Sequence, residues 1–304
     1  MDLAKTDNLL NVFFKQYTKQ NSKEIFLNWL KFPEKNYSWE ETKVNIIKLA
    51  KELKKNLNKG ERCLLVSENR PEWLISDIAI MLAGGITVPS YITYTEKDYE
   101  FIIDDCEPTI IIVSNQILFN KLKDVIPKKK FIKKIVLFDE IKKNILSDQI
   151  IELKNILSST LNFDENNPII DLNRKDPACI IYTSGTGGNP KGVVLSHGGI
   201  LSNCEGAINL IKPILSSRTR FLTWLPLSHS YEHTVQFVQI SVGAKIYYAE
   251  GIDKLLKNMS ECKPEIMTAV PRFYQNLYQK INSNFKKQTG FKKKIINTTI
   301  NLGN

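Results

Sequence analysis

The sequence lacks the long apolar runs and the paired cysteines that are typical of membrane-spanning and disulfide-rich proteins. No stretch approaches the roughly 18 consecutive apolar residues that a spanning helix needs. The N-terminus lacks the basic-then-apolar order of a signal peptide. The five cysteines are dispersed, with no CxxC pair and no metal-type spacing to the three histidines. We therefore expect a soluble cytoplasmic protein with reduced thiols and no cysteine-bound metal.

Arginine is also scarce, although the chain is basic. Six arginines stand against 36 lysines in a chain of net charge +10. Eight basic residues and one acid lie between Lys263 and Asn304. A lysine excess with few arginines and no interleaved aromatic residues is not typical of nucleic-acid recognition, so we expect no nucleic-acid partner. Peripheral contact with the inner face of a membrane stays open for this basic segment.

Strand-like and helix-like segments alternate along nearly the whole chain. Strands are expected at residues 61–69, 86–90, 108–115, 131–139, 177–184, 192–197, 220–226, 244–250 and 265–270. Helices are expected at residues 71–85, 95–106, 116–126, 140–159, 198–211, 231–243 and 252–260, and from residue 271 onward. The alternation predicts an α/β fold with layered, mostly parallel β-sheets flanked by helices.

A polar stretch with two prolines, residues 163–177, interrupts this alternation. It predicts a boundary between a first α/β subdomain, residues 1–175, and a second one, residues 176–304.

A glycine-rich connector, residues 183–192, joins two of the expected strands. Its glycines let backbone amides approach a ligand and form an anion-binding concavity. Ser184 and Thr186 add hydroxyls, and Lys191 adds a mobile positive charge. The spacing does not match a Walker A loop, a dinucleotide fingerprint, a protein-kinase loop or a G-x-S-x-G elbow. The connector therefore predicts a phosphate site of another type, with a long hairpin loop as the alternative.

The stretch "YTSGTGGNPKG", residues 182–192, resembles the signature of the adenylate-forming enzymes. Two later stretches, "LPLSHSYEH" at 225–233 and "AVPRFYQNLY" at 269–278, resemble the long-chain acyl-CoA synthetase subgroup. Gly187 stands where the family has a second hydroxyl residue, which implies altered loop flexibility rather than loss of the site. The resemblance covers the chain from about residue 20 and implies the N-terminal domain of that fold, truncated in its second subdomain and without the C-terminal lid domain.

The resemblance also implies a reaction and its site. ATP and a long-chain fatty acid give an acyl-adenylate and pyrophosphate, and coenzyme A then attacks the acyl carbon and releases AMP. Thr186 is expected to ligate Mg²⁺, Lys191 to hold the departing pyrophosphate, and His229 to donate a hydrogen bond near the carboxylate. The expected nucleotide-binding residues are Thr183, Ser184, Gly185, Thr186, Gly187, Gly188, Lys191 and His229.

Further residues are expected near this site, and alternatives stay open for the extent of the chain and for its function. Other residues are expected to orient or pack around the site: Glu232, His233, His197, Trp224, Arg272 and Tyr274. The missing later motifs indicate either a fragment of a longer synthetase or a naturally short relative. Another adenylate-forming acid ligase and a non-catalytic nucleotide-binding module stay open as functions.

The first prediction concerns Lys191. Replacing Lys191 by Ala in the full polypeptide should lower acid-dependent ATP–pyrophosphate exchange by roughly 10²–10³-fold, the range for losing a charge-stabilising donor. Unchanged exchange would remove Lys191 from the mechanism.

Overall fold

A computed structural model describes the chain except for residues 1, 142–148, 160–170, 184–189, 217–218 and 304. It contains two compact units, Met1–Ile266 and Met267–Asn304. The second unit holds helices α10 (Pro271–Lys286) and α11 (Gly290–Gly303). The subdomain boundary expected between residues 175 and 176 stays a prediction.

A seven-stranded sheet in the first unit carries the glycine-rich connector. Its order is β7-β6-β5-β3-β4-β8-β9, and every neighbouring pair is parallel except β8 with β9. The short apolar runs predicted as buried strands form its centre, since strands covered on both faces need apolar side chains throughout. The bounds are β3 (Arg62–Val66), β4 (Ile86–Ser90), β5 (Ile110–Val113), β6 (Lys134–Leu137), β7 (Ile150–Glu152), β8 (Pro177–Thr183) and β9 (Lys191–Ser196).

A five-stranded sheet has the order β12-β10-β11-β1-β2. Strands β1, β11 and β10 are parallel, and β2 is antiparallel to β1. The expectation of mostly parallel sheets is therefore confirmed. The bounds are β1 (Ile25–Trp29), β2 (Tyr37–Ser38), β10 (Arg220–Thr223), β11 (Lys245–Tyr248) and β12 (Ile266–Met267).

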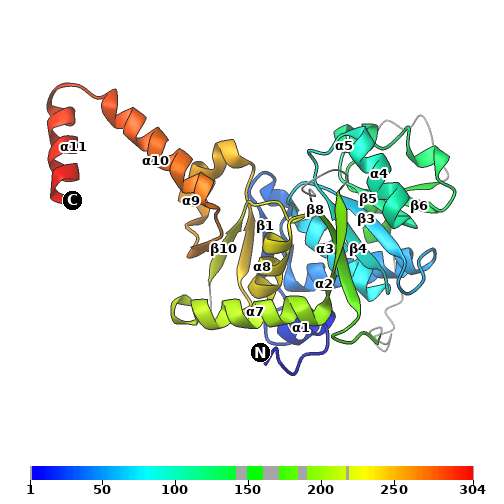
Figure 1. Ribbon diagram of the computed structural model, residues 1–304. Helices are drawn as coiled ribbons and strands as arrows, with labels where there is room; N and C mark the ends of the chain where they lie inside the picture. Colours follow the sequence, from blue (N-terminus) through cyan, green and yellow to red (C-terminus); the bar gives the residue numbers. More distant parts are fainter. Residues whose placement is uncertain (1, 142–148, 160–170, 184–189, 217–218, 304) are drawn as a thin grey trace. The chain divides into compact units, whose positions relative to one another are not determined.

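Helices cover the strands, and Figure 1 shows α4 and α5 beside β5 and β6. Pro71 opens α3 at its first turn, and Thr95 caps α4 in a capping box with Asp98. The helices of the first unit are α1 (Leu9–Tyr17), α2 (Trp39–Lys54), α3 (Pro71–Leu82), α4 (Glu96–Cys106), α5 (Gln116–Asn120), α6 (Leu153–Ser158), α7 (His197–Ile211), α8 (Ser230–Ser241) and α9 (Leu255–Cys262).

One continuous core of buried side chains joins the two sheets. It includes Phe26 and Ile246 from the five-stranded sheet, Cys63 and Ile110 from the seven-stranded sheet, and much of α3. Among the described helices, none is both long enough and apolar enough to cross a bilayer.

Two expected helices differ from the sequence pattern. The helix expected at 140–159 is wrong at Ile150–Glu152, which forms β7, whereas Leu153–Ser158 is helical; residues 142–148 lie outside the described residues. Pairing of Ile150 with Ile135 at the sheet edge overrides the local helical periodicity, because β-branched side chains fit a pleated surface. The helix expected at 116–126 ends at Asn120 and is followed by turns.

His197 shows how the fold buries a titratable group. It is the first residue of α7, is 1% exposed, and accepts a hydrogen bond at Nδ1 from the backbone N–H of Leu9 at 3.3 Å. Burial lowers the pKa of His197 to about 4, against weaker opposing effects of Asp176 and Asp77. The neutral ring is therefore the form that the fold stabilises.

The second prediction is a pH dependence of stability at His197. The folded-state pKa lies below the unfolded value, so this stabilisation is present above about pH 6.5 and is lost as pH falls toward about 4. The loss should reach at most about 3 kcal/mol. His197→Gln keeps an acceptor for Leu9 and cannot titrate, so its unfolding free energy, measured by urea denaturation from pH 4 to 7, should fall less steeply than that of the wild type. Equal slopes for the two proteins would contradict the assignment.

Candidate functional site

A cavity of about 320 Å³ opens where strands of both sheets end. Residues that follow the carboxyl ends of β1, β3, β4, β10 and β11 line it. Parallel strands bring the residues after their carboxyl ends to one edge, which is where α/β sheets bind ligands. Lining side chains include Trp29, Glu68, Asn69, Tyr91, Trp224 and Ser228.

Aromatic side chains form much of the cavity wall. Trp29 ends β1, Tyr91 follows β4, and Trp224 follows β10. Trp224 was expected to fill the core, but it is half-buried and borders the cavity. The wall therefore offers flat apolar surface beside the polar side chains of Glu68 and Asn69.

A buried arginine lies behind this wall. Arg70 is 1% exposed and donates to both carboxylate oxygens of Glu72 at 2.8 and 3.2 Å, and to both oxygens of Asp139 at 3.2 and 3.0 Å. Its guanidinium lies 4.4 Å from the ring centre of Trp29 and 5.2 Å from that of Phe138. Burial lowers the pKa of Arg70, but Glu72 and Asp139 raise it by more, so the net pKa is above its ordinary value. The charged guanidinium thus fixes Trp29 against the end of the other sheet.

Glu68 presents its carboxylate to the cavity from a fixed position. It accepts hydrogen bonds from the Ser114 hydroxyl and, at 3.2 Å, from Nδ2 of Asn115. Both donors follow β5, the neighbour of β3. A 3.5 Å contact with Nη1 of Arg70 adds an opposite charge. The cavity therefore has an oriented acceptor on its seven-stranded side.

The glycine-rich connector leaves the seven-stranded sheet at this same edge. Thr183 ends β8, Lys191 begins β9, and the two are register partners with exposed side chains. Because Thr87 of β4 pairs with Cys179 of β8, the carboxyl ends of β4 and β8 lie side by side. Five predicted nucleotide-binding residues lie outside the described residues: Ser184, Gly185, Thr186, Gly187 and Gly188.

His229 directly follows Ser228, which lines the cavity. It is exposed and caps α8, because its Nδ1 accepts the backbone N–H of Tyr231 at 3.2 Å. This contact assigns the proton of the neutral ring to Nε2. The hydrogen bond that His229 is expected to donate near the carboxylate stays a prediction. His229 follows β10 of the five-stranded sheet, whereas Thr183 and Lys191 belong to the seven-stranded sheet.

Two neighbours of His229 are buried in α8. His233 contacts Asp77 of α3 through Nε2 at 2.8 Å, and Glu232 is 1% exposed. Burial lowers the pKa of His233, but Asp77 and Cys179 raise it by more, so the net pKa is well above its ordinary value. His233 thus joins α8 to α3 and fixes the helix that His229 caps.

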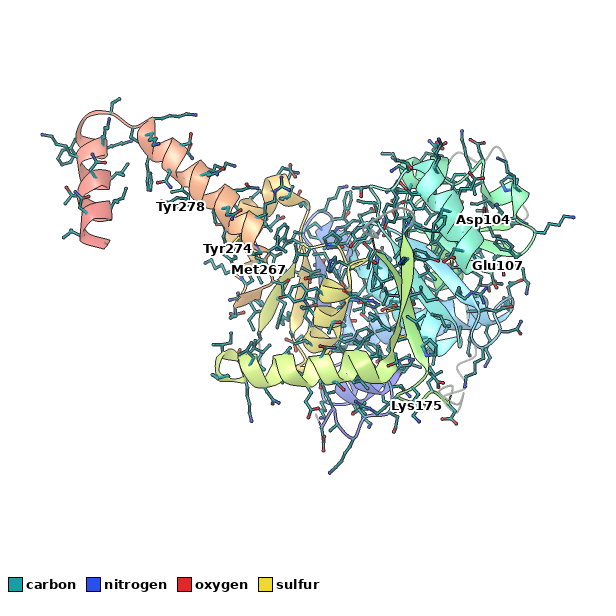
Figure 2. All side chains as sticks on the ribbon, in the orientation of Figure 1. Asp104, Glu107, Lys175, Met267, Tyr274 and Tyr278 are labelled. Carbon is teal, nitrogen blue, oxygen red and sulfur yellow. The ribbon has the colours of Figure 1, made fainter. Side chains whose placement is uncertain are left out.

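Arg272 and Tyr274 lie in the second unit on α10. Both are exposed, and Figure 2 shows Tyr274 and Tyr278 on this helix. Their expected packing beneath an acyl site stays a prediction.

Sequence reasoning missed Glu68, Asn69 and Arg70. A signal was present, because the polar run "SENR" directly follows a buried strand and precedes Pro71 at a helix start. Polar side chains at the carboxyl end of a parallel strand are the usual source of ligand contacts in such sheets.

The fold is of the α/β type, with a cavity at the strand ends and with Thr183 and Lys191 at the edge of the seven-stranded sheet where β8 ends and β9 begins. A sequence model of the family "AMP-binding enzyme" matches residues 13–298. The chain therefore belongs to the AMP-binding enzyme family.

Curated relatives agree with this assignment. The chain is 30% identical to long chain acyl-CoA synthetase 3 of Arabidopsis thaliana over 265 residues, which is 83% of this chain and 39% of the relative. It is also 30% identical to fatty acyl-CoA synthetase A of Dictyostelium discoideum, over 81% of this chain and 37% of the relative. The chain thus spans less than half the length of the curated relatives it matches.

Solved structures share the fold. The anthranilate CoA ligase AuaEII superimposes with a TM-score of 0.79 at 19% identity, covering 90% of this chain and 52% of that one. A long-chain-fatty-acid-CoA ligase from Archaeoglobus fulgidus gives a TM-score of 0.77 at 22% identity, covering 91% and 54%.

The third prediction separates the capping role of His229 from any chemical role. His229→Ala removes the acceptor for the Tyr231 N–H and should lower the free energy of unfolding by about 1 kcal/mol, whereas His229→Asn keeps a good cap and should stay within about 0.5 kcal/mol of the wild type. Urea denaturation measures both. Equal destabilisation by the two substitutions would show that the ring does not cap α8.

Proposed function

We propose that this chain carries the ATP-binding part of an ATP-dependent acid–thiol ligase that acts on long-chain fatty acids. The observation that carries the proposal is the family match over residues 13–298, together with a cavity at the strand ends beside the glycine-rich connector. The names of the curated relatives support a long-chain fatty acid and coenzyme A as substrates.

The first step of the proposed reaction is attack of the carboxylate on the α-phosphorus of ATP. Its barrier comes largely from bringing two anions together, so positioning and positive charge should dominate catalysis. Lys191 supplies a cation at the start of β9, and Nε2 of His229, the residue after the lining residue Ser228, supplies a hydrogen-bond donor. In the second step coenzyme A takes the acyl group and AMP leaves.

Mg²⁺ at Thr186 remains a prediction, because Thr186 lies outside the described residues. Within the described part of the chain, no group of three or more His, Cys, Asp or Glu side chains is arranged to hold a metal ion. When bound, the metal would neutralise triphosphate charge.

We also propose that the protein is cytoplasmic and makes peripheral contact with the inner face of a membrane. Apolar side chains recur on one face of α10 at Tyr274, Tyr278, Ile281 and Phe285, and all four are exposed. The unit Met267–Asn304 contains seven basic residues and no acid. This pattern supports contact with an anionic lipid surface.

The fourth prediction concerns the acid. Thioester formation by the full polypeptide should give a kcat/KM that rises with acyl length from acetate upward, by up to about threefold to fourfold per buried methylene, because each contributes about 0.8 kcal/mol. Lys191→Ala should abolish most activity at every length. Lys175→Ala is the matched control, because Lys175 is exposed and precedes the amino end of β8, whereas the connector leaves its carboxyl end. A preference for acetate would contradict the long-chain assignment, and ATP binding without thioester or adenylate formation would indicate a non-catalytic module instead.

A further inference from the structure

We propose that Asn69 is a positioning residue that holds the segment leading to His229 in a fixed place relative to the seven-stranded sheet, which carries Lys191. The inference rests on the proposed function, because it assigns Asn69 a part in the same reaction.

The side-chain amide of Asn69 makes two hydrogen bonds to one backbone segment. Its Nδ2 donates to the carbonyl oxygen of Leu225 at 2.7 Å, and its Oδ1 accepts the N–H of Leu227 at 3.1 Å. The amide thus donates to Leu225 and accepts from Leu227, two residues further along the same segment. The backbone of a neighbouring β-strand pairs with a segment in the same alternating way. Two short bonds from one planar group restrain both the position and the rotation of that segment.

Asn69 is itself fixed on its own side of the cavity. The preceding Glu68 is held by Ser114 and Asn115, and the following Arg70 is held by Glu72 and Asp139. The carbonyl oxygen of Arg70 also accepts the N–H of Trp73 at 2.9 Å, in the first turn of α3. The side-chain amide of Asn69 is therefore fixed relative to the seven-stranded sheet, and its hydrogen bonds fix Leu225 and Leu227 relative to that sheet.

The restrained segment leads directly to His229. The N–H of His229 donates to the carbonyl oxygen of Pro226 at 3.0 Å, which closes a turn right after the Asn69 contacts. The imidazole is oriented in turn by the N–H of Tyr231. A shift of Leu225 and Leu227 would therefore move the ring.

The two groups that must act together come from different sheets. Lys191 begins β9 of the seven-stranded sheet, whereas His229 follows β10 of the five-stranded sheet. Asn69 follows β3 and bonds to residues after β10, so it crosses from one sheet to the other at the cavity, which it lines. A misplacement of about 1 Å is enough to slow a reaction that depends on alignment.

The test compares Asn69→Ala, which removes both contacts, with Asn69→Asp, which keeps the size and the acceptor for Leu227 but cannot donate to Leu225. In acid-dependent pyrophosphate exchange by the full polypeptide, both variants should lower kcat by about tenfold and leave the KM for ATP within about twofold. Asn120→Ala, at an exposed position on α5, is the matched control and should match the wild type.

A double-mutant cycle with His229→Asn tests whether Asn69 acts through His229. If it does, the loss caused by Asn69→Ala should shrink to about twofold or less when His229 is already replaced, because coupled residues are non-additive. Equal tenfold losses in both backgrounds would overturn the proposal, since a merely structural residue would slow either enzyme alike. A rise in the KM for ATP with unchanged kcat would overturn it as well.

Hydrogen exchange of the backbone amides separates this inference from the proposed function. The amide of Leu227 should exchange at least about tenfold faster in Asn69→Ala than in the wild type and stay protected in Asn69→Asp. Unchanged protection in Asn69→Ala would overturn the restraint. Wild-type protein that performs no exchange of pyrophosphate would refute the proposed function and the kinetic role of Asn69, while the Leu227 result would still report on the restraint itself.

Discussion

The buried charge of Arg70 constrains how the strand ends of the two sheets pack, because it must stay paired with carboxylates while it contacts Trp29. An uncompensated buried cation would be strongly destabilising. Arg70 therefore requires its ion pairs with the carboxylates of Glu72 and Asp139. Its flat guanidinium also contacts Trp29 from one sheet and Phe138 from the other. One buried side chain thereby contacts aromatic rings at or after the ends of strands from both sheets, and one of these rings, that of Trp29, lines the cavity.

The cavity is composite because residues from both sheets line it. The seven-stranded sheet supplies the connector with Lys191 and the acceptor Glu68, and the five-stranded sheet supplies Trp29, Trp224 and the segment before His229. A phosphate group and a carboxylate that meet between them would be held by groups from both. Packing across the sheet ends is therefore as important to such a site as the residues that touch a ligand.

Local sequence patterns predicted the elements where local physics decides them. Thr95 with Asp98, and Pro71 at a helix start, specify their helices through caps that depend only on neighbours in sequence. The helix expected at 140–159 failed at Ile150 because pairing with β6, a non-local interaction, decides that segment. The role of Asn69 could not be predicted for the same reason, because its hydrogen-bond partners lie 156 and 158 residues away in the sequence.

The sequence by itself determined the α/β class, the family resemblance and the identity of the connector residues, because these follow from periodicity and from a contiguous motif. Only the tertiary structure decided that His229 caps α8 with Nδ1, that Trp224 borders a cavity, and that Asn69 crosses between sheets. Those facts depend on side chains brought together from distant parts of the chain, and no local pattern encodes a distance between two sheets.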